Sequence, residues 1–170
     1  TAEGKPHAAP MGIRVLEGNL FSVRPYLKTK TYQNLKFSKA CTANLTSNPK
    51  IFYLATFKDE PEIGGFPSNF FLPASRVKAP RLRMAEAWLE LEALKVEVVG
   101  DRAFFTCRLE ALNLGCRFPK AYCRADFAAI ESIIHTTRIL EFTEADLKAE
   151  AEKLLKLLAS YRLFVKRTAP

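Results

Sequence analysis

Residues 20–45 read LFSVRPYLKTKTYQNLKFSKACTANL, and this stretch decides the fold. It opens with an alternating apolar pattern, which is typical of a half-buried strand. A run with helical spacing, TYQNLKFSK, follows, and ACTANL then returns to a strand pattern. Two lysines alternate with two threonines where the strand gives way to the helix. We expect Thr31 to be the N-cap of that helix.

This strand-to-helix turn has the chemistry of an anion site. The first N–H groups of a helix lack partners within it and carry the positive end of its dipole, so they favour an anion. Lys28 and Lys30 add charge, Thr29 and Thr31 add hydroxyl donors, and Asn34 lies about one turn further along. A monoester phosphate carries about −1.5 to −2 charges near neutral pH and suits such a turn. A capped helix with ordinary solvated lysines explains the same residues equally well.

The positive charge of the chain is concentrated around this turn. The 170 residues have a formal net charge of +8. Residues 1–50 hold eight Lys or Arg against two acids, a net of +6, and the remaining residues hold 18 against 16, a net of +2. A local positive field attracts a phosphate ester, a nucleic acid or an acidic lipid.

Turn residues and alternating runs extend the β pattern on both sides. Gly18-Asn19 predicts a tight turn before the strand at residue 20. AEAWLELEALKVEVVG and RAFFTCRLEAL predict a hairpin across Gly100-Asp101. Residues 49–57 fit a strand or a helix. Residues 58–80 are rich in Pro, Gly and Ser, and we expect a long irregular segment whose phenylalanines, Phe66, Phe70 and Phe71, pack onto the β domain.

The C-terminal part predicts two amphipathic helices. The first places an apolar stripe on one face, formed by Phe127, Ile130, Ile133, Ile134 and Leu140. The second is expected to begin at Thr143 as N-cap, with Asp146 at N3. We expect an αα-hairpin that packs on the β domain or on a partner subunit.

Several classes of protein are excluded by missing patterns. The chain has no apolar run of about 18–20 residues, no signal-peptide pattern, no dinucleotide fingerprint and no P-loop. His7 and His135 lack the spacing of a catalytic triad. The four cysteines, Cys41, Cys107, Cys116 and Cys123, form no metal-binding motif. We read them as free thiols, with a disulfide as the alternative, and expect a cytoplasmic protein without a metal.

Residues 4–49, GKPHAAPMGIRVLEGNLFSVRPYLKTKTYQNLKFSKACTANLTSNP, resemble the flavin-binding half of the FMN-binding split-barrel superfamily. More closely, the chain is similar to a largely archaeal family labelled domain of unknown function 447. That family also shows a segment like Ala85 to Glu92 and a helix like Cys123 to Arg138. The order and spacing of these motifs carry the resemblance, from about Thr1 to Leu140.

The resemblance implies a mainly β fold with α-helices. It implies a six-stranded split β-barrel over residues 1–122, with its first strand truncated, and a helical extension over residues 123–170. Such barrels usually form homodimers with one FMN near each subunit interface. In this chain the departures are Lys28-Thr29, where relatives have Gly-Ser, and Cys123, where Asn is usual.

The resemblance also assigns cofactor-binding residues. The FMN phosphate would lie at the turn from Lys28 to Asn34, and the flavin ring along Ala9–Gly12. Arg24 would reach the phosphate or the ring. The full expected set is Pro10, Met11, Gly12, Arg24, Lys28, Thr29, Lys30, Thr31 and Asn34.

The leading hypothesis is a flavoprotein that binds FMN noncovalently and acts as an oxidoreductase or flavin reductase of undefined substrate. Its electron donor would be NAD(P)H or another small molecule, and the sequence indicates no catalytic base. The first alternative is a non-catalytic flavin carrier. The second, less favoured, is a nucleic-acid-binding protein in which aromatics such as Phe21, Tyr26 and Tyr32 serve as stacking platforms.

Overall fold

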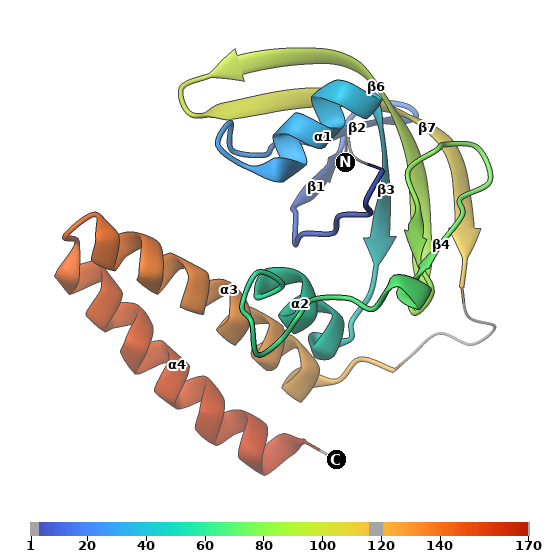
Figure 1. Ribbon diagram of the computed structural model, residues 1–170. Coiled ribbons are helices and arrows are strands. Elements are labelled where there is room, and N and C mark those ends of the chain that lie inside the picture. Colours follow the sequence, from blue (N-terminus) through green and yellow to red (C-terminus); the bar gives the residue numbers. More distant parts are fainter. Residues whose placement is uncertain (1–3, 116–120, 170) are drawn as a thin grey trace.

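A five-stranded antiparallel sheet dominates the computed structural model, which describes residues 4–115 and 121–169 (Figure 1). Its spatial order is β1-β2-β7-β6-β3. The strands are β1 Ile13–Val15, β2 Leu20–Val23, β3 Ala40–Leu45, β6 Ala87–Val99 and β7 Arg102–Leu114. A second, two-stranded sheet pairs β4 Phe71–Leu72 with β5 Arg81–Leu82. The predicted class, mainly β with α and a C-terminal helical pair, is confirmed.

The count of six strands is not reproduced in the main sheet. Within the described residues that sheet has five strands, because residues 5–12 add none ahead of the short β1. Pro6 and Pro10 lie in this segment, and proline has no N–H to donate to a ladder. The segment contacts α1 through His7, whose Nε2 lies 3.2 Å from Thr31 Oγ, and it meets the site described below there.

Both predicted β-turns are present. Glu17 to Leu20 closes the β1–β2 hairpin, with Leu16 N–H donating to the Leu20 carbonyl at 2.8 Å. Gly18 has φ +64°, a conformation that glycine adopts without a Cβ clash. The long β6–β7 hairpin reverses at Gly100, whose φ is +59°.

The predicted helix after β2 exists, but its N-cap is Thr29 and not Thr31. Helix α1 spans Lys30–Ser38, and Thr29 Oγ accepts a hydrogen bond from Tyr32 N–H at 3.3 Å. The same hydroxyl donates to the Tyr26 carbonyl at 2.7 Å. Thr29 has the extended backbone of a cap, with φ −91° and ψ 149°, so the helix starts two residues earlier than expected.

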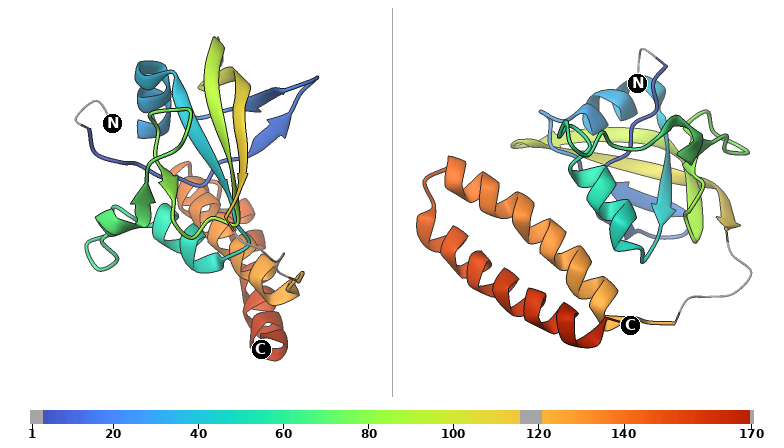
Figure 2. Two further views of the ribbon diagram at one scale, coloured as in Figure 1. Left: turned by 90° about the vertical axis from the view of Figure 1, so that its right-hand side faces the viewer. Right: turned by 60° about the horizontal axis from the view of Figure 1, so that its bottom comes forward.

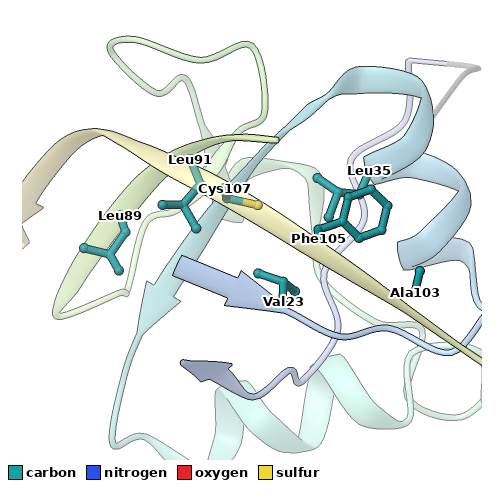
Figure 3. Packing of buried hydrophobic residues seen from close by; sticks show 7 residues of the cluster. All are labelled: Val23, Leu35, Leu89, Leu91, Ala103, Phe105 and Cys107. Atoms are coloured by element: carbon teal, nitrogen blue, oxygen red, sulfur yellow. The ribbon is translucent and has the colours of Figure 1, made fainter. Parts of the chain in front are cut away.

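Leu35 fastens α1 to the sheet. It is 3% exposed and meets Phe105 of β7 in the core, together with Val23, Leu91 and Ala103 (Figure 3). Burial of a leucine side chain is worth roughly 1.5–3 kcal/mol, so this contact fixes the position of the helix start. The free thiols of Cys41 and Cys107 share the core. Cys123 is also a free thiol, and Cys116 lies outside the described residues.

Residues 49–56, which the sequence left open, form helix α2 (Pro49–Thr56). Asn48 caps it by accepting from Lys50 N–H at 3.0 Å, and proline occupies the first turn, where its missing N–H costs nothing. The irregular segment beyond contains a 3-10 turn, Ser68–Phe70. Phe66 and Phe71 pack on a small core formed by Ile51 of α2, Leu82 of β5 and Ala85, so the expected packing holds for these two and involves α2 as well as the β domain. Phe70 is not part of that core, and its ring centroid lies 6.0 Å from that of Phe66.

A buried carboxylate holds the loop between β4 and β5. Glu90 is 0% exposed and accepts hydrogen bonds from six donors. Four belong to Ser75, Arg76 and Val77, at 2.5–3.2 Å, and the others are Trp88 Nε1 and Asn113 Nδ2, both at 3.2 Å. Burial alone would raise the pKa of Glu90, but these hydrogen bonds outweigh it and lower the pKa to about 2.

The C-terminal helical pair is confirmed, with corrected details. Helix α3 spans Arg124–Glu144 and α4 spans Lys148–Thr168. Thr143 is not a cap, because its hydroxyl donates to the Ile139 carbonyl at 2.8 Å inside α3. Asp146, with φ +57°, lies in the turn between the helices.

The expected apolar stripe of α3 is partly wrong. Phe127 and Leu140 are 41% and 57% exposed, whereas Ala125, Ala128 and His135 are buried. Helix α3 packs against both α2 and α4, and small residues allow that close approach. His135 stacks on Tyr161 of α4 with ring centroids 5.9 Å apart, so it serves packing.

The helical pair lies beside the β-rich part, with α2 between them (Figure 2). Helix α3 contacts α2, and α4 packs antiparallel against α3. Among the described residues no helix combines the length and apolar content needed to cross a membrane.

Candidate functional site

A cavity of about 430 Å³ opens where the N-terminal segment, α1 and the loop after α2 meet. This volume lies in the range of small-molecule sites. Aromatic side chains and glycines form part of its wall, and cationic groups cluster in it. It is lined by Lys5, Pro6, His7, Ala8, Lys30, Gln33, Asn34, Phe37, Lys58, Asp59, Gly64, Gly65, Phe66 and Phe71.

Three of the predicted site residues meet at this cavity. Lys30 and Asn34 line it, and Thr31 is joined to it through its hydroxyl, 3.2 Å from His7 Nε2. All three belong to α1, where they fall within the first five residues of the helix. The structure therefore brings these three residues together in the first turns of α1, whereas the sequence prediction had placed Lys30 before the helix.

The start of α1 presents donors that the fold itself does not use. Among the described residues, the backbone N–H groups of Lys30 and Thr31 have no acceptor, as expected for the first positions of a helix. The side-chain Nδ2 of Asn34 is buried and also has no hydrogen-bond partner. A buried unpaired donor costs about 1–3 kcal/mol, so an acceptor bound here would recover that free energy.

The cavity carries an excess of positive charge. Lys30 and Lys58 flank Asp59, with Nζ to carboxylate oxygen distances of 3.5 Å and 4.0 Å. Burial lowers the pKa of Lys58, and Lys30 lowers it further, while Asp59 opposes both. Asp59 is the one acidic residue among the fourteen that line the cavity. An anionic ligand would meet two lysines whose charges are only partly balanced.

His7 is held neutral at physiological pH. Burial lowers its pKa to about 4, and the positive charges of Lys58 and Lys30 contribute. A neutral imidazole has one donor and one acceptor nitrogen, and Nε2 is the one within reach of Thr31. The low pKa of His7 therefore reflects its burial first and the positive charges of the two lysines second.

The other predicted site residues lie outside the cavity lining. Thr29 uses its hydroxyl to cap α1, and Lys28 is exposed in the turn before it. Arg24 stacks over Phe104, 4.7 Å from the ring centroid, and its Nε donates to Ser22 Oγ at 3.3 Å. Pro10, Met11 and Gly12 begin two residues after Ala8, which does line the cavity, and lead into β1.

Sequence reasoning missed the wall contributed by distant segments. His7 was considered only as a triad member, and Lys58 and Asp59 were simply the start of an irregular loop. That loop's length and its Gly64-Gly65 pair were the available signal, because long loops in compact domains often carry function. Both glycines have positive φ, at 65° and 67°.

The described residues do not support two other readings of this region. No group of three or more His, Cys, Asp or Glu in the described part could hold a metal ion. Phe21 and Tyr32 pack against the core, and Arg102 lies 3.8 Å over the ring of Tyr26, so these aromatics are not open stacking surfaces.

Comparison with solved structures defines the fold as that of flavin reductase-like proteins. The crystal structure of an FMN-bound protein from Methanosarcina mazei, itself matched to the family model DUF447, has a TM-score of 0.79. It is 22% identical, over 96% of this chain and 81% of that one. No curated protein matches the chain in sequence.

Two further structures share the fold at lower similarity. One is BorF, the flavin reductase component of a bacterial two-component tryptophan halogenase. It is 20% identical with a TM-score of 0.52, over 63% of this chain and 69% of that one. The other is the flavin reductase HpaC complexed with NADP+, 16% identical with a TM-score of 0.51, over 66% and 69%.

The sequence comparison is more specific. Residues 1–115 match the family model described as protein of unknown function (DUF447), N-terminal domain, which covers more than half of the 170 residues. The chain belongs to this family, and the resemblance drawn from its motifs is confirmed.

Proposed function

We propose that the chain binds FMN noncovalently, with the phosphate at the start of α1. The observation that carries this proposal is the set of unused donors there, namely the N–H groups of Lys30 and Thr31 and the buried Asn34 Nδ2. The Lys30 ammonium adds positive charge beside them, although it also lies 3.5 Å from Asp59. A phosphate monoester supplies acceptor oxygens and a negative charge for all of them. The FMN bound by the related Methanosarcina mazei protein supports the choice of ligand.

The rest of the cavity fits the apolar part of such a ligand. Phe37, Phe66 and Phe71 supply aromatic wall, and the segment from Ala8 to Gly12 leads away from the cavity lining at Ala8 towards β1. A Cβ added at Gly12 would have nothing within 4 Å, so a planar ring can approach the backbone there. A bound FMN would supply the redox chemistry, while these residues supply position, shielding from water and positive charge.

We propose further that the protein is an oxidoreductase of the flavin reductase type, with NAD(P)H or another small molecule as electron donor. The fold it shares with BorF and HpaC supports this reading. No residue is assigned as a catalytic base. A non-catalytic flavin carrier is the alternative, and it is compatible with the few ionisable groups that the described residues bring to the cavity, which are Lys5, His7, Lys30, Lys58 and Asp59.

A homodimer with FMN near the interface completes the proposal. Beyond Glu92, β6 no longer pairs with β3, and its outer part is an open edge with exposed apolar residues. Leu94, Val96 and Val98 are 51%, 44% and 56% exposed there. Such an edge is normally covered in the native assembly. In this arrangement, residues 1–122 form the cytoplasmic flavin-binding unit and residues 123–170 the helical extension.

Titration of the purified protein with FMN tests the proposal. Binding should quench flavin fluorescence and give the protein-bound flavin absorption bands. Replacing Lys30 and Thr31 together by Ala should weaken binding at least about tenfold, because charge-assisted hydrogen bonds contribute about 1.5–3 kcal/mol each. Lys36→Ala is the matched control, since this exposed lysine of α1 lies outside the cavity lining.

Parent protein that leaves FMN fluorescence unchanged would refute flavin binding itself. If the double variant and the parent bind FMN equally well, the phosphate lies elsewhere. Oxidation of NAD(P)H by the FMN-loaded protein would favour the reductase, and its absence with every donor tried would favour the carrier.

A further inference from the structure

A second concavity, of about 520 Å³, lies between the three helices α2, α3 and α4. It is separate from the α1 cavity, and the two share no lining residue. Each helix contributes residues spaced by three or four, so one face of each helix meets the groove. It is lined by Pro49, Lys50, Tyr53, Ala129, Ser132, Ile133, Arg162, Val165 and Lys166.

The floor of this groove is apolar. Pro49, Ala129, Ile133 and Val165 contribute aliphatic surface, and each is at least partly buried. Tyr53 adds an aromatic ring that is 44% exposed. The one hydroxyl of the α3 wall, on Ser132, already donates to the Ala128 carbonyl at 2.8 Å. The floor therefore suits a hydrocarbon or aromatic body.

The rim of the groove is cationic. Lys50, Arg162 and Lys166 line it, and none of its nine lining residues is acidic. None of these three cations forms an ion pair with a described residue. Three uncompensated cations around an apolar floor are complementary to one anionic head on an apolar body.

We propose that this groove binds a small amphipathic carboxylate, of the medium-chain aliphatic or aromatic class. The volume and the nine lining residues favour a small molecule over a protein partner. About 520 Å³ lies in the range of ligand pockets, whereas a stable protein interface buries about 800 Å² on each partner and uses 20–30 residues. The ligand would bridge α2 to α3 and α4, and so fasten the helical pair to the rest of the molecule. This inference does not depend on flavin binding.

Calorimetric titration with decanoate, below its micellar concentration, tests the proposal, with decanol as the neutral analogue of equal chain length. The parent should bind one decanoate per chain, and decanol at least about tenfold more weakly. The double variant Arg162→Ala/Lys166→Ala should lose at least about tenfold in decanoate affinity. The matched control, Lys153→Ala/Lys156→Ala, removes two α4 cations outside the groove and should stay within about twofold of the parent.

Three outcomes would overturn the proposal. These are equal affinity for decanol and decanoate, equal weakening in both double variants, and no decanoate binding by folded parent protein. If decanoate does not bind, sedimentation velocity on the same samples shows whether a second copy of the chain covers the groove instead. FMN titration of the same preparation is read separately, so failure of the flavin site and failure of the groove are distinguishable.

Discussion

Replacing Glu90 by Gln should destabilise the protein by about 3 kcal/mol or more at pH 7. The carboxylate is fully buried and accepts six hydrogen bonds, of which two, from Arg76 and Val77 N–H, reach Oε2. An amide nitrogen at Oε2 cannot accept these two bonds. Each hydrogen bond to a charged group contributes about 1.5–3 kcal/mol, so the loss of two gives the stated minimum.

Urea unfolding at a series of pH values measures this effect. The folded pKa of Glu90, about 2, lies below the ordinary value of 4.5, so the carboxylate stabilises the fold fully above pH 4.5. That stabilisation is lost as the pH falls from 4.5 towards 2. The difference in unfolding free energy between the parent and Glu90→Gln should therefore stay constant from pH 8 to about 5 and become smaller below pH 5.

The control for this measurement is Glu92→Gln on the same strand. Glu92 is half exposed and pairs with Arg108 at 2.6 Å, so its loss should cost at most about 1 kcal/mol. The reasoning is wrong if the unfolding free energy of Glu90→Gln lies within about 0.5 kcal/mol of the parent value at pH 7. It is also wrong if the difference between the two unfolding free energies is the same at pH 3 as at pH 7.

Three further predictions concern the turn and the cavity. Thr29→Ala should lower the unfolding free energy by about 1 kcal/mol, because it removes the N-cap of α1. An unfolding free energy in urea close to that of the parent would show that Thr29 does not stabilise the helix start. Gly12→Ala should leave thermal stability unchanged, since its Cβ meets nothing within 4 Å, yet weaken FMN binding; unaltered affinity would move the ring away from Gly12. Saturating FMN should raise the pKa of His7 from about 4, because the phosphate would bring negative charge close to the imidazole. NMR follows this titration, with His7→Asn to assign the signal. An unchanged pKa of His7 would place the phosphate too far away to act on the imidazole.

The sequence predicted those elements whose signal is local. Alternation in β6 and β7, with Gly100 between them, predicted the long hairpin, and the apolar spacing after β2 predicted the helix that carries Asn34. The cap moved from Thr31 to Thr29 because two threonines occupy cap-like positions. Thr29 is the cap because its hydroxyl also donates to the Tyr26 carbonyl, and the turn that brings these two groups together has no signal in the sequence.

The parts that were missed depend on contacts between distant segments. His7 lies 24 residues from Thr31, and Asp59 lies 29 residues from Lys30, so neither pairing has a spacing signal. The exposure of Phe127 was also unpredictable, because helical periodicity does not say that α3 packs against two neighbours. Residues 5–12 also form no strand that pairs with β1, so the main sheet has five strands among the described residues.

The ratio of the dissociation constants for riboflavin and FMN tests the central claim most directly. Riboflavin has the same ring and ribityl chain as FMN but lacks the phosphate. If the start of α1 holds the phosphate, the parent should bind FMN at least about a hundredfold more tightly than riboflavin, because two or more charge-assisted hydrogen bonds are at stake. Lys30→Ala/Thr31→Ala should reduce that ratio while leaving riboflavin binding unchanged. Equal affinity of the parent for both flavins would contradict the claim.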